Sequence, residues 1–257
     1  MSDIAVTVDQ VSKRFRLYRE RNQTLKSALL RGRVSDHDEF WALRDVSFEV
    51  PRGETFGLIG RNGSGKSTLL KVLARIYEPD GGRVVMNGRA SSMLEVGSGF
   101  HPELSGRENI FLNGSILGLS KKQVTARFDE IVEFSGVEAF IDQPVKNYSS
   151  GMYVRLGFAV AVHTEPDILI VDEILAVGDG AFREKSRRKF LEFTGEGRTV
   201  ILVTHSLPQI RSMCQQVAWL ENGRLRQLGE SHEVADAYEA SLADNDGNLP
   251  TAEMEED

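Results

Sequence analysis

The sequence predicts an α/β fold in which a mixed sheet core is joined to an antiparallel β subdomain and a helical subdomain. First, the apolar runs at residues 168–171 and 200–203 alternate with helical segments, as buried strands of an α/β core do. Second, short strand-like segments separated by turns occupy the N-terminal part. Third, residues 106–136 carry apolar side chains three and four positions apart, the spacing of amphipathic helices. A chain of 257 residues is long enough to bury one full core of this kind.

Composition narrows the expected partners and compartment. The net charge of −7 and the pI of about 5.4 give no overall attraction to nucleic acid or anionic lipid, so we expect no nucleic-acid partner. Cys214 is the single cysteine and the N-terminus resembles no secretory leader, which together indicate a reducing cytoplasm. Apolar runs stay far below the roughly 20 residues needed to span a bilayer. Any membrane step is therefore expected from a partner.

The N-terminal segments predict the antiparallel part. Residues 4–8, 11–18 and 43–50 read as strands, and a fourth short strand is expected at residues 83–86, after the turn at 79–82. Between them, residues 19–39 are basic at first, with Leu25, Leu29 and Leu30 at helical spacing. This insert predicts a short basic amphipathic helix and a loop. We expect a solvated surface helix, with a membrane or partner contact as the alternative.

A glycine-rich loop joins the apolar strand at residues 55–59 to a helix at 67–75. Glycines allow successive backbone N–H groups to turn toward phosphate oxygens, and the positive end of the helix adds to this attraction. In this strand, loop and helix order, Lys66 is expected at the β and γ phosphates and Ser67 as a Mg²⁺ ligand. The predicted nucleotide-binding residues of this stretch are Gly60, Arg61, Asn62, Gly63, Ser64, Gly65, Lys66, Ser67 and Thr68.

The remaining elements follow in order along the chain. The helical subdomain is expected at about residues 100–165, followed by strands at 168–171, 200–203, 217–220 and 225–228 and helices at 181–193 and 209–213. The domain is predicted to end at residue 240. Residues 241–257 are acidic and lack basic or aromatic side chains, so they are predicted to be a disordered tail.

The other predicted catalytic groups, in addition to Lys66, come from residues that follow predicted strands. Asp172 and Glu173 follow a buried strand at the carboxyl edge of the sheet, where ligands bind in such folds. Asp172 would hold Mg²⁺ through water, and Glu173 would orient or deprotonate the attacking water. His205 follows the next strand and could bridge the γ-phosphate and that water. Alternatively, Asp172 and Glu173 are solvated acids of a loop, and His205 is a polar residue that caps its strand.

A second anion site is predicted at Ser149, Ser150 and Gly151, which precede the helix at residues 152–164. The N-terminus of a helix attracts phosphate, yet the glycine loop already provides a site for the chain's own nucleotide. Two phosphate sites for one nucleotide suggest a head-to-tail dimer.

With these motifs, the chain resembles the nucleotide-binding subunit of an ABC transporter over residues 4–238. The resemblance implies a P-loop NTPase of the ABC ATPase type that hydrolyses ATP with Mg²⁺. Two subunits would enclose two ATP molecules, with Ser149 and Gly151 of one facing the γ-phosphate held by the other. Glu173 matches the catalytic glutamate, His205 the switch histidine and Asp179 the D-loop.

Departures from the family pattern leave two positions open. The Q-loop glutamine has no match in residues 93–102; Glu95 is the best candidate for its place at Mg²⁺, and Val96 is the alternative. For the aromatic residue that stacks on adenine, Phe15 aligns best, with Phe40 and Trp41 as rivals. Each could equally be an ordinary core aromatic.

The signature Tyr-Ser-Ser-Gly-Met at residues 148–152, the stretch 95–109 and the insert before Phe40 together resemble the polysaccharide and teichoic acid exporters. That subfamily implies a homodimer bound to two copies of a membrane permease at the cytoplasmic face of the inner membrane. Its cargo would be a polyprenyl-diphosphate-linked glycan: O-antigen, teichoic acid or cell-wall galactan. An added carbohydrate-binding domain is not expected after Tyr238.

Two other functions fit the sequence less well. A soluble ABC-type ATPase acting on nucleic acid or ribosomes would call for a coiled-coil insertion, a second nucleotide domain or a basic face. A regulatory module that holds ATP without turnover is disfavoured by Glu173 and His205.

Overall fold

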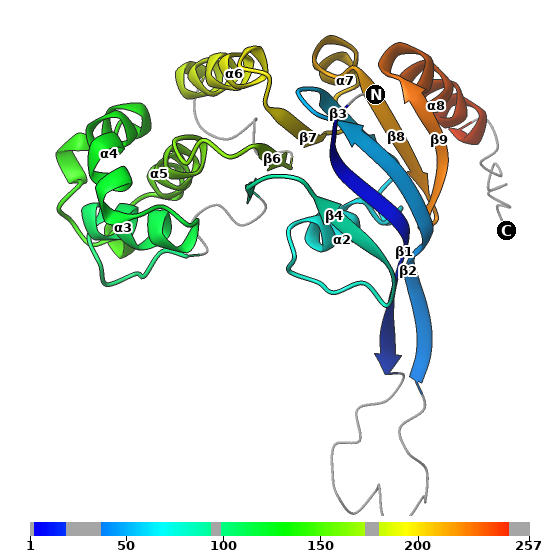
Figure 1. Cartoon of the computed structure of the whole chain (residues 1–257), viewed down its shortest axis with the longest axis horizontal. Helices are drawn as coiled ribbons and strands as arrows, with labels where there is room; N and C mark the ends of the chain where they lie inside the picture. Colours follow the sequence, from blue (N-terminus) through cyan, green and yellow to red (C-terminus); the bar gives the residue numbers. More distant parts are fainter. Residues whose placement is uncertain (1–2, 19–36, 94–98, 173–179, 247–257) are drawn as a thin grey trace, which may run out of the picture.

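The computed structural model describes residues 3–18, 37–93, 99–172 and 180–246. Two sheets lie together on one side of the molecule and a group of helices lies on the other (Figure 1). The three predicted parts, an antiparallel sheet, a mostly parallel sheet and a helical subdomain, are therefore all present.

The antiparallel sheet has the strand order β2-β1-β4. Its strands are β1 (Ile4–Tyr18), β2 (His37–Pro51) and β4 (Gly81–Met86). The segments predicted as two strands at 4–8 and 11–18 form one strand, interrupted by register shifts around Gln10, which has a φ of 50°. This irregularity breaks the alternation of side chains along β1, which explains why the sequence pattern predicted two strands with a gap between residues 8 and 11. The far ends of β1 and β2 project from the body of the molecule side by side (Figure 1).

The second sheet has the order β5-β6-β7-β3-β8-β9, and only β9 runs antiparallel to its neighbour. Its strands are β3 (Thr55–Ile59), β5 (Ala90–Ser92), β6 (Ile168–Val171), β7 (Thr199–Val203), β8 (Gln216–Glu221) and β9 (Arg224–Glu230). Every residue of β3, β6 and β7 is buried, as continuous apolar runs predict. The three-residue β5 was not predicted because so short a segment shows no periodicity.

Alternate residues of the central strands feed two separate cores. In β6, Ile168 and Ile170 pack with α2 (Lys66–Leu73) and the antiparallel sheet, while Leu169 and Val171 pack with the helices on the other face. This alternation follows from the two-residue repeat of a strand. Each fully buried aliphatic side chain contributes about 1.5–3 kcal/mol relative to an exposed one.

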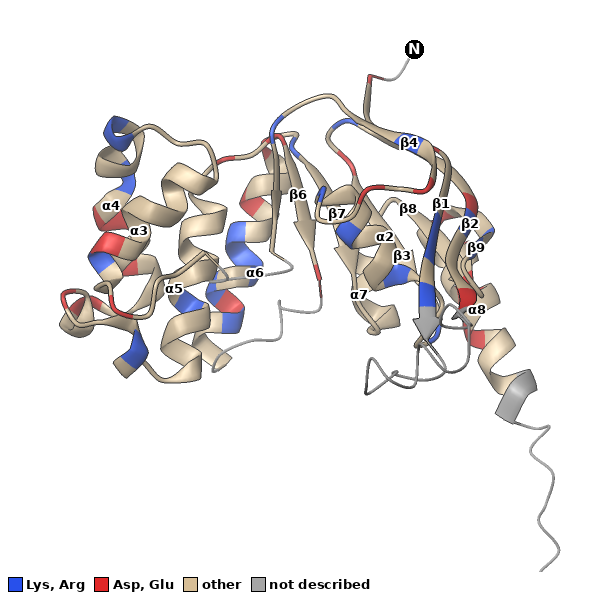
Figure 2. Cartoon of the chain, turned by 90° about the horizontal axis from the view of Figure 1, so that it is seen from below, with Lys and Arg blue, Asp and Glu red and all other residues tan. Residues whose placement is uncertain are grey.

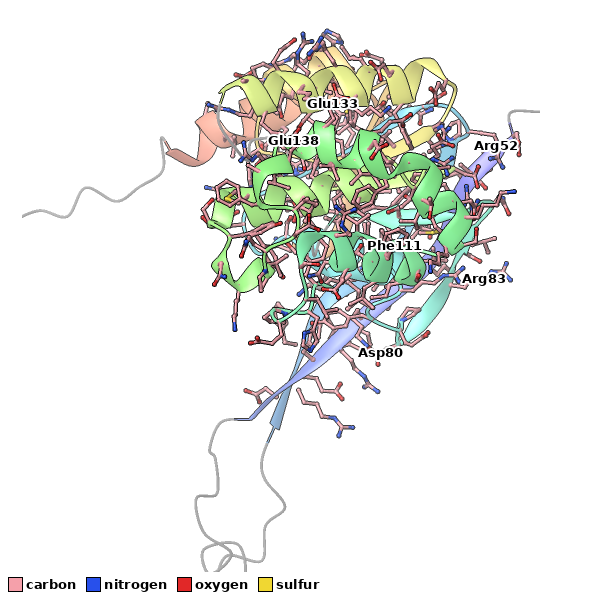
Figure 3. The ribbon with its side chains drawn as sticks, turned by 90° about the vertical axis from the view of Figure 1, so that its left-hand side faces the viewer. Arg52, Asp80, Arg83, Phe111, Glu133 and Glu138 are labelled. Atoms are coloured by element: carbon pink, nitrogen blue, oxygen red, sulfur yellow. The ribbon has the colours of Figure 1, made fainter. Side chains whose placement is uncertain are left out.

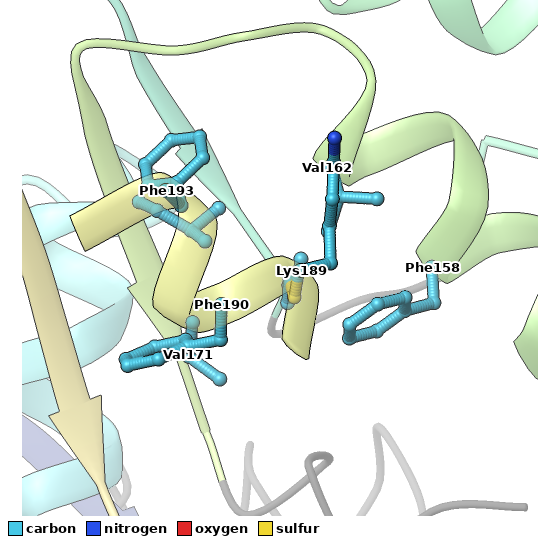
Figure 4. A pocket seen from close by; sticks show the side chains of 8 residues that line it. Phe158, Val162, Val171, Lys189, Phe190 and Phe193 are labelled. Carbon is cyan, nitrogen blue, oxygen red and sulfur yellow. The ribbon is translucent and has the colours of Figure 1, made fainter. Parts of the chain in front are cut away.

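Helices α6 (Gly180–Gly195), α7 (Leu207–Met213) and α8 (Ser231–Asp246) cover the second sheet. A cavity of about 10 Å³ lies among α5 (Ser150–Val162), α6 and β6, walled by Phe158, Val162, Phe190 and neighbouring side chains (Figure 4). The cavity has room for about one water, but its apolar walls offer that water no hydrogen-bond partners, and it is too small for a ligand. This cavity is a packing defect, and the functional site lies elsewhere.

The helical subdomain consists of α3 (Gly106–Ile116), α4 (Lys121–Ser135) and α5 (Ser150–Val162), with short 3₁₀ turns at Glu138–Phe140 and Val145–Asn147. Capping boxes at Ser105 and Ser120 begin α3 and α4 by bonding the free N–H groups of the first turn. Phe111, labelled in Figure 3, stacks on Phe128 of α4 with ring centroids 5.8 Å apart. These helices lie within the range expected for the subdomain.

The C-terminal boundary differs from the prediction. Helix α8 continues to Asp246, six residues beyond the predicted end of the domain at 240. Leu242 packs against the core, and the Ser241 hydroxyl donates to the Tyr238 carbonyl. The acidic composition concealed this last turn, since one apolar side chain per turn gives a weak helical signal. Residues 247–257, the rest of the predicted tail, lie outside the described part of the chain.

Charge is mixed over the surface, and α4 and α6 each carry both basic and acidic positions (Figure 2). The basic insert falls almost wholly within residues 19–36, which are not described. Within the described ranges, no helix combines the length and the apolar character that crossing a bilayer requires.

Candidate nucleotide-binding site

A hollow of about 390 Å³ opens where β3, β6 and β7 end. A volume of this order suits a cofactor-sized ligand. Its walls come from four separate parts of the chain, namely β2, the glycine loop with α2, and the residues that follow β6 and β7. The residues lining the hollow are Phe40, Ala42, Asn62, Gly63, Gly65, Lys66, Ser67, Thr68, Asp172, Val203 and His205.

Glycine is required by the conformation of the loop. Gly60 has a φ of 147°, and a Cβ atom there would lie 2.2 Å from the Leu220 carbonyl oxygen. Gly65 has a φ of 105°, and its Cβ would lie 2.6 Å from the Ala42 carbonyl oxygen. Both positions combine the left-handed region with close backbone contacts, so any side chain would displace the loop. The loop thus holds one shape at the edge of the hollow.

Helix α2 begins at Lys66, directly after this loop. Gly65, its N-cap residue, has no side chain to bond the free N–H groups of the first turn. These groups and the positive end of the helix are available to an anion in the hollow. The arrangement fits a phosphate group.

Lys66 is buried, with 7% of the residue exposed, and it lies in the wall of the hollow. Its ammonium donates to the carbonyl oxygens of Gly60, at 2.6 Å, and Arg61, at 2.9 Å. These bonds satisfy a charge that would be costly to bury alone. A cation is therefore held beside the predicted phosphate site.

Asp172 and His205 reach the same hollow from neighbouring parallel strands. Asp172 directly follows β6, and His205 lies two residues beyond β7. The turn that carries His205 is fixed by Thr204, whose hydroxyl donates to the Gln209 side chain and accepts from the Ser206 N–H. The Ser67 hydroxyl and Asp172 carboxylate are hard oxygen donors on one hollow, the ligand type that Mg²⁺ prefers. This donor set fits Mg²⁺.

Three predicted site residues, Glu173, Asp179 and Glu95, lie outside the described residues, as does Val96, the alternative to Glu95. Their roles remain predictions.

The aromatic residue at the hollow is Phe40, whereas Phe15 is not among the lining residues that the structure describes. Phe15 instead packs edge-on against Tyr77, with ring centroids 5.6 Å apart. Trp41 carries the Arg14 guanidinium over its ring, 5.5 Å from the centroid. Phe40 is 48 % exposed, which leaves a ring face open to a ligand. The structure thus places Phe40, and not Phe15, at the hollow, and the residue that stacks on adenine stays a prediction.

The second predicted anion site lies apart from the first. Among the described residues, neither Ser149 nor Gly151 lines the hollow. Ser149 is the N-cap residue of α5, where its hydroxyl accepts from the Met152 N–H at 3.2 Å, and it is exposed. One protomer therefore presents two helix N-termini at different places, as the sequence suggested.

Ala42 and Val203 are apolar walls that sequence reasoning missed. Both look like ordinary strand residues, and no local pattern marks them as facing a ligand. Only the pairing of distant strands brings them to the hollow.

A profile described as "ABC transporter" matches residues 43–176, just over half of the chain. This chain belongs to the ABC transporter family. The prediction of an ATP-hydrolysing enzyme is confirmed by this membership.

Several relatives of this ABC ATPase are similar over nearly all of its length. The O-antigen export system ATP-binding protein RfbB of Klebsiella pneumoniae is 43% identical, with 93% of this chain and 98% of that protein covered. The protein of the same name from Myxococcus xanthus is 48% identical, but the chain spans only 56% of its length. The teichoic acids export ATP-binding protein TagH of Listeria innocua is 44% identical, with 92% and 70% covered.

Solved structures share the fold of this ABC ATPase. A dimeric ATP-binding cassette in a post-hydrolysis state, bound to ADP and Pi, superposes with a TM-score of 0.70 at 20% identity, covering 88% of this chain and 98% of that one. An ATP-binding subunit of an ABC transporter gives 0.72 at 23% identity, covering 91% and 93%. The predicted ABC ATPase fold is confirmed.

Proposed function

We propose that the chain is the ATP-hydrolysing subunit of an exporter that moves a polyprenyl-diphosphate-linked polysaccharide across the cytoplasmic membrane. The observation that carries this proposal is the similarity, at 43–48% identity over about nine tenths of the chain, to ATP-binding proteins named for O-antigen and teichoic acid export. The similarity supports the exporter and not an ATPase that acts on nucleic acid or ribosomes. O-antigen, teichoic acid and cell-wall galactan are the candidate cargoes.

In the proposed site, the backbone N–H groups of residues 60–67 and the first turn of α2 bind the phosphates of ATP. Lys66 adds positive charge at the β and γ phosphates. Ser67 and Asp172 would hold Mg²⁺, which neutralises phosphate charge when bound. The exposed ring of Phe40, on the same hollow, would stack on adenine.

Hydrolysis is proposed to need both protomers of a homodimer. His205 would orient the attacking water at the γ-phosphate, and Glu173 would take its proton. Ser149 and Gly151, at the exposed N-terminus of α5, would bind the γ-phosphate held by the partner protomer. The separation of the two helix N-termini within one protomer supports this head-to-tail arrangement.

The proposed assembly is two copies of this chain and two copies of a membrane permease. The chain would sit as a peripheral subunit on the cytoplasmic face of the inner membrane, and the permease would carry the glycan across.

A deletion strain complemented with plasmid-borne variants tests the proposal. We expect wild-type protein to restore the surface polysaccharide and to co-purify in detergent with an untagged permease. The Glu173→Gln variant should co-purify equally well, hydrolyse ATP far more slowly, and leave lipid-linked glycan inside the cell. Two results together would contradict export. The protein would be an active ATPase that associates with no membrane protein, and the deletion strain would carry normal surface polysaccharide. A Glu173→Gln variant as active as wild type would contradict the assignment of the base.

A further inference from the structure

The turn that precedes α3 and the segment that leads into the signature are bonded together along their length. The first segment is 101–107 and the second is 141–146. Four backbone hydrogen bonds of 2.9–3.2 Å join them, from Gly106 to Gln143, Arg107 to Ile141, Val145 to Leu104 and Lys146 to Pro102. Ion pairs between Arg107 and Asp142 and between Lys146 and Glu103 flank these bonds. The two segments therefore behave as one ribbon, although each is irregular in sequence.

Asn109 fixes the first segment from inside the protein. This residue is fully buried, and the two hydrogens of its amide nitrogen are shared among the carbonyl oxygens of His101, Leu104 and Ser105, at 2.9–3.1 Å. Its side-chain oxygen accepts from the His101 N–H at 2.7 Å. A buried amide with its bonding capacity met in this way holds a turn in one shape. This turn belongs to the stretch 95–109 that carries the resemblance to glycan exporters, and none of the described residues of that stretch lines the hollow.

Tyr148 connects this ribbon to the signature turn. Its hydroxyl donates to the Phe140 carbonyl oxygen at 2.8 Å and lies against Gly106, the first residue of α3. A Cβ atom on Gly106 would lie 2.3 Å from the Tyr148 hydroxyl oxygen, and 3.1 Å from both the carbonyl oxygen and Cδ1 of Ile141. A side chain at 106 would thus have to displace the tyrosine hydroxyl. Burial raises the pKa of Tyr148, so the hydroxyl keeps its proton and remains a donor.

A second aromatic contact supports the other side of the signature turn. Phe100, which is 6% exposed, packs edge-on against Tyr153 in the first turn of α5, with ring centroids 5.2 Å apart. Ser149, the N-cap of α5, lies in the sequence between Tyr148 and Tyr153. Ser149 is therefore flanked in the sequence by two tyrosines, one lying against Gly106 and the other packed on Phe100.

We propose that Tyr148 is a positioning residue for ATP hydrolysis. Its hydroxyl, held between Gly106 and the Phe140 carbonyl, fixes Ser149 at the place from which it reaches the nucleotide of the partner protomer. The inference rests on the proposed function, in which Ser149 binds that nucleotide. A displacement of about 1 Å at such a group costs on the order of 100-fold in rate. The protomer's own nucleotide contacts, on the separate hollow at α2, do not depend on Tyr148.

A double-mutant cycle on purified full-length protein tests this role, with Tyr148→Phe, Gly106→Ala and the two combined. We expect Tyr148→Phe to lower kcat about threefold to tenfold, the effect of one lost hydrogen bond. Gly106→Ala should lower kcat about 10- to 100-fold, because the new methyl displaces the hydroxyl. The combined variant should recover to the level of Tyr148→Phe, since the hydroxyl that clashes with the methyl is gone.

The affinity of the isolated subunit for ATP separates positioning from folding. It should stay within about twofold of wild type in all three variants, because the glycine loop and Phe40 are untouched. Tyr77→Phe, which removes a tyrosine hydroxyl from the segment that follows α2, is the matched control and should leave kcat unchanged. If Gly106→Ala prevents folding, Tyr148→Phe alone must still lower kcat without changing the ATP affinity.

Unchanged kcat in Tyr148→Phe would overturn the positioning role while leaving the proposed function intact. The positioning role would also be overturned if Gly106→Ala lowered kcat by the same factor in the wild-type protein and in the Tyr148→Phe variant. A wild-type protein that hydrolyses ATP at full specific activity as a monomer would overturn the two-protomer mechanism itself, and the positioning role with it.

Discussion

The ammonium of Lys66 donates to the carbonyl oxygen of Gly60 across 2.6 Å, so the first residue of α2 holds the first residue of the glycine loop. A second bond, to the Arg61 carbonyl, brings the same charge over the loop. The lysine therefore closes the loop while lining the hollow in which we place the phosphates. Its removal should affect both roles.

Lys66→Ala should weaken ATP binding about 10- to 100-fold, the usual cost of losing hydrogen bonds to a charged group. Binding of adenosine should change little, because adenosine has no phosphate. Titration calorimetry with both ligands measures the difference. Lys71→Ala is the control, since Lys71 lies on the same helix over the Tyr77 ring. Equal losses for ATP and adenosine would place Lys66 away from the phosphates.

Phe40→Ala should weaken ATP binding about 5- to 100-fold, because stacking between a base and an aromatic ring is worth about 1–3 kcal/mol. Phe40→Tyr should keep most of the affinity. Phe15→Ala should lower the thermal midpoint, through its lost contact with Tyr77, but leave the affinity near wild type. Fluorescence titration with an ATP analogue measures all three variants. The opposite ranking of Phe15 and Phe40 would restore Phe15 as the adenine contact.

The central part of the fold could be predicted because its signals are local. Four consecutive apolar residues define each of β6 and β7, and polar residues bound both runs. Sequence patterns did not predict the elements whose structure depends on residues far away in the chain. The strand β5 is three residues long and exists because Ser91 and its neighbours pair with β6. Because of the bulge near Gln10, the sequence pattern predicts two strands where the structure has the single strand β1.

The same distinction holds in the site. The glycine loop, Asp172 and His205 were predicted because each lies at the end of an apolar strand, a position visible in sequence. Phe15 and Phe40 are paired across β1 and β2, separated in sequence by the insert, and only the course of the two strands decides which ring meets the hollow. The contact of Tyr148 with Gly106 likewise has no sequence signature.

Alkaline pH should reveal the buried thiol of Cys214. Burial raises its pKa to about 12, above the value of about 8.5 for an exposed thiol. The folded chain thus keeps a proton that the unfolded chain releases, so this contribution to stability is complete below about pH 8.5 and falls as the pH rises toward 12. Over that range the free energy of unfolding should drop by about 1.4 kcal/mol per pH unit from this group.

Urea unfolding at pH 8, 9 and 10 measures that slope. Cys214→Ala should lower stability at every pH because it leaves a cavity, yet its decline with pH should be shallower than that of wild type by about the amount above. Lysines and tyrosines titrate in both proteins and cancel in the comparison. Parallel declines in the two proteins would show that the thiol is accessible to solvent.

Truncation tests the boundary of the domain at α8. Ending the chain after residue 246 should leave stability near that of the full chain. Ending it after residue 240 removes Leu242 from the core and the bond of Ser241 to Tyr238, and should cost about 1–2 kcal/mol. The rest of α8 should stay folded, because Tyr238 packs on Trp219 and Arg211 of α7 pairs with Asp236 and Glu239.

The free energy of urea unfolding compares the two truncated chains with Leu242→Ala in the full chain. That variant keeps the backbone of the last turn and loses only the apolar contact, so it should account for most of the loss seen on truncation after 240. If the chain ending at 240 is as stable as the one ending at 246, the last turn of α8 contributes nothing and the domain ends where composition alone placed its boundary.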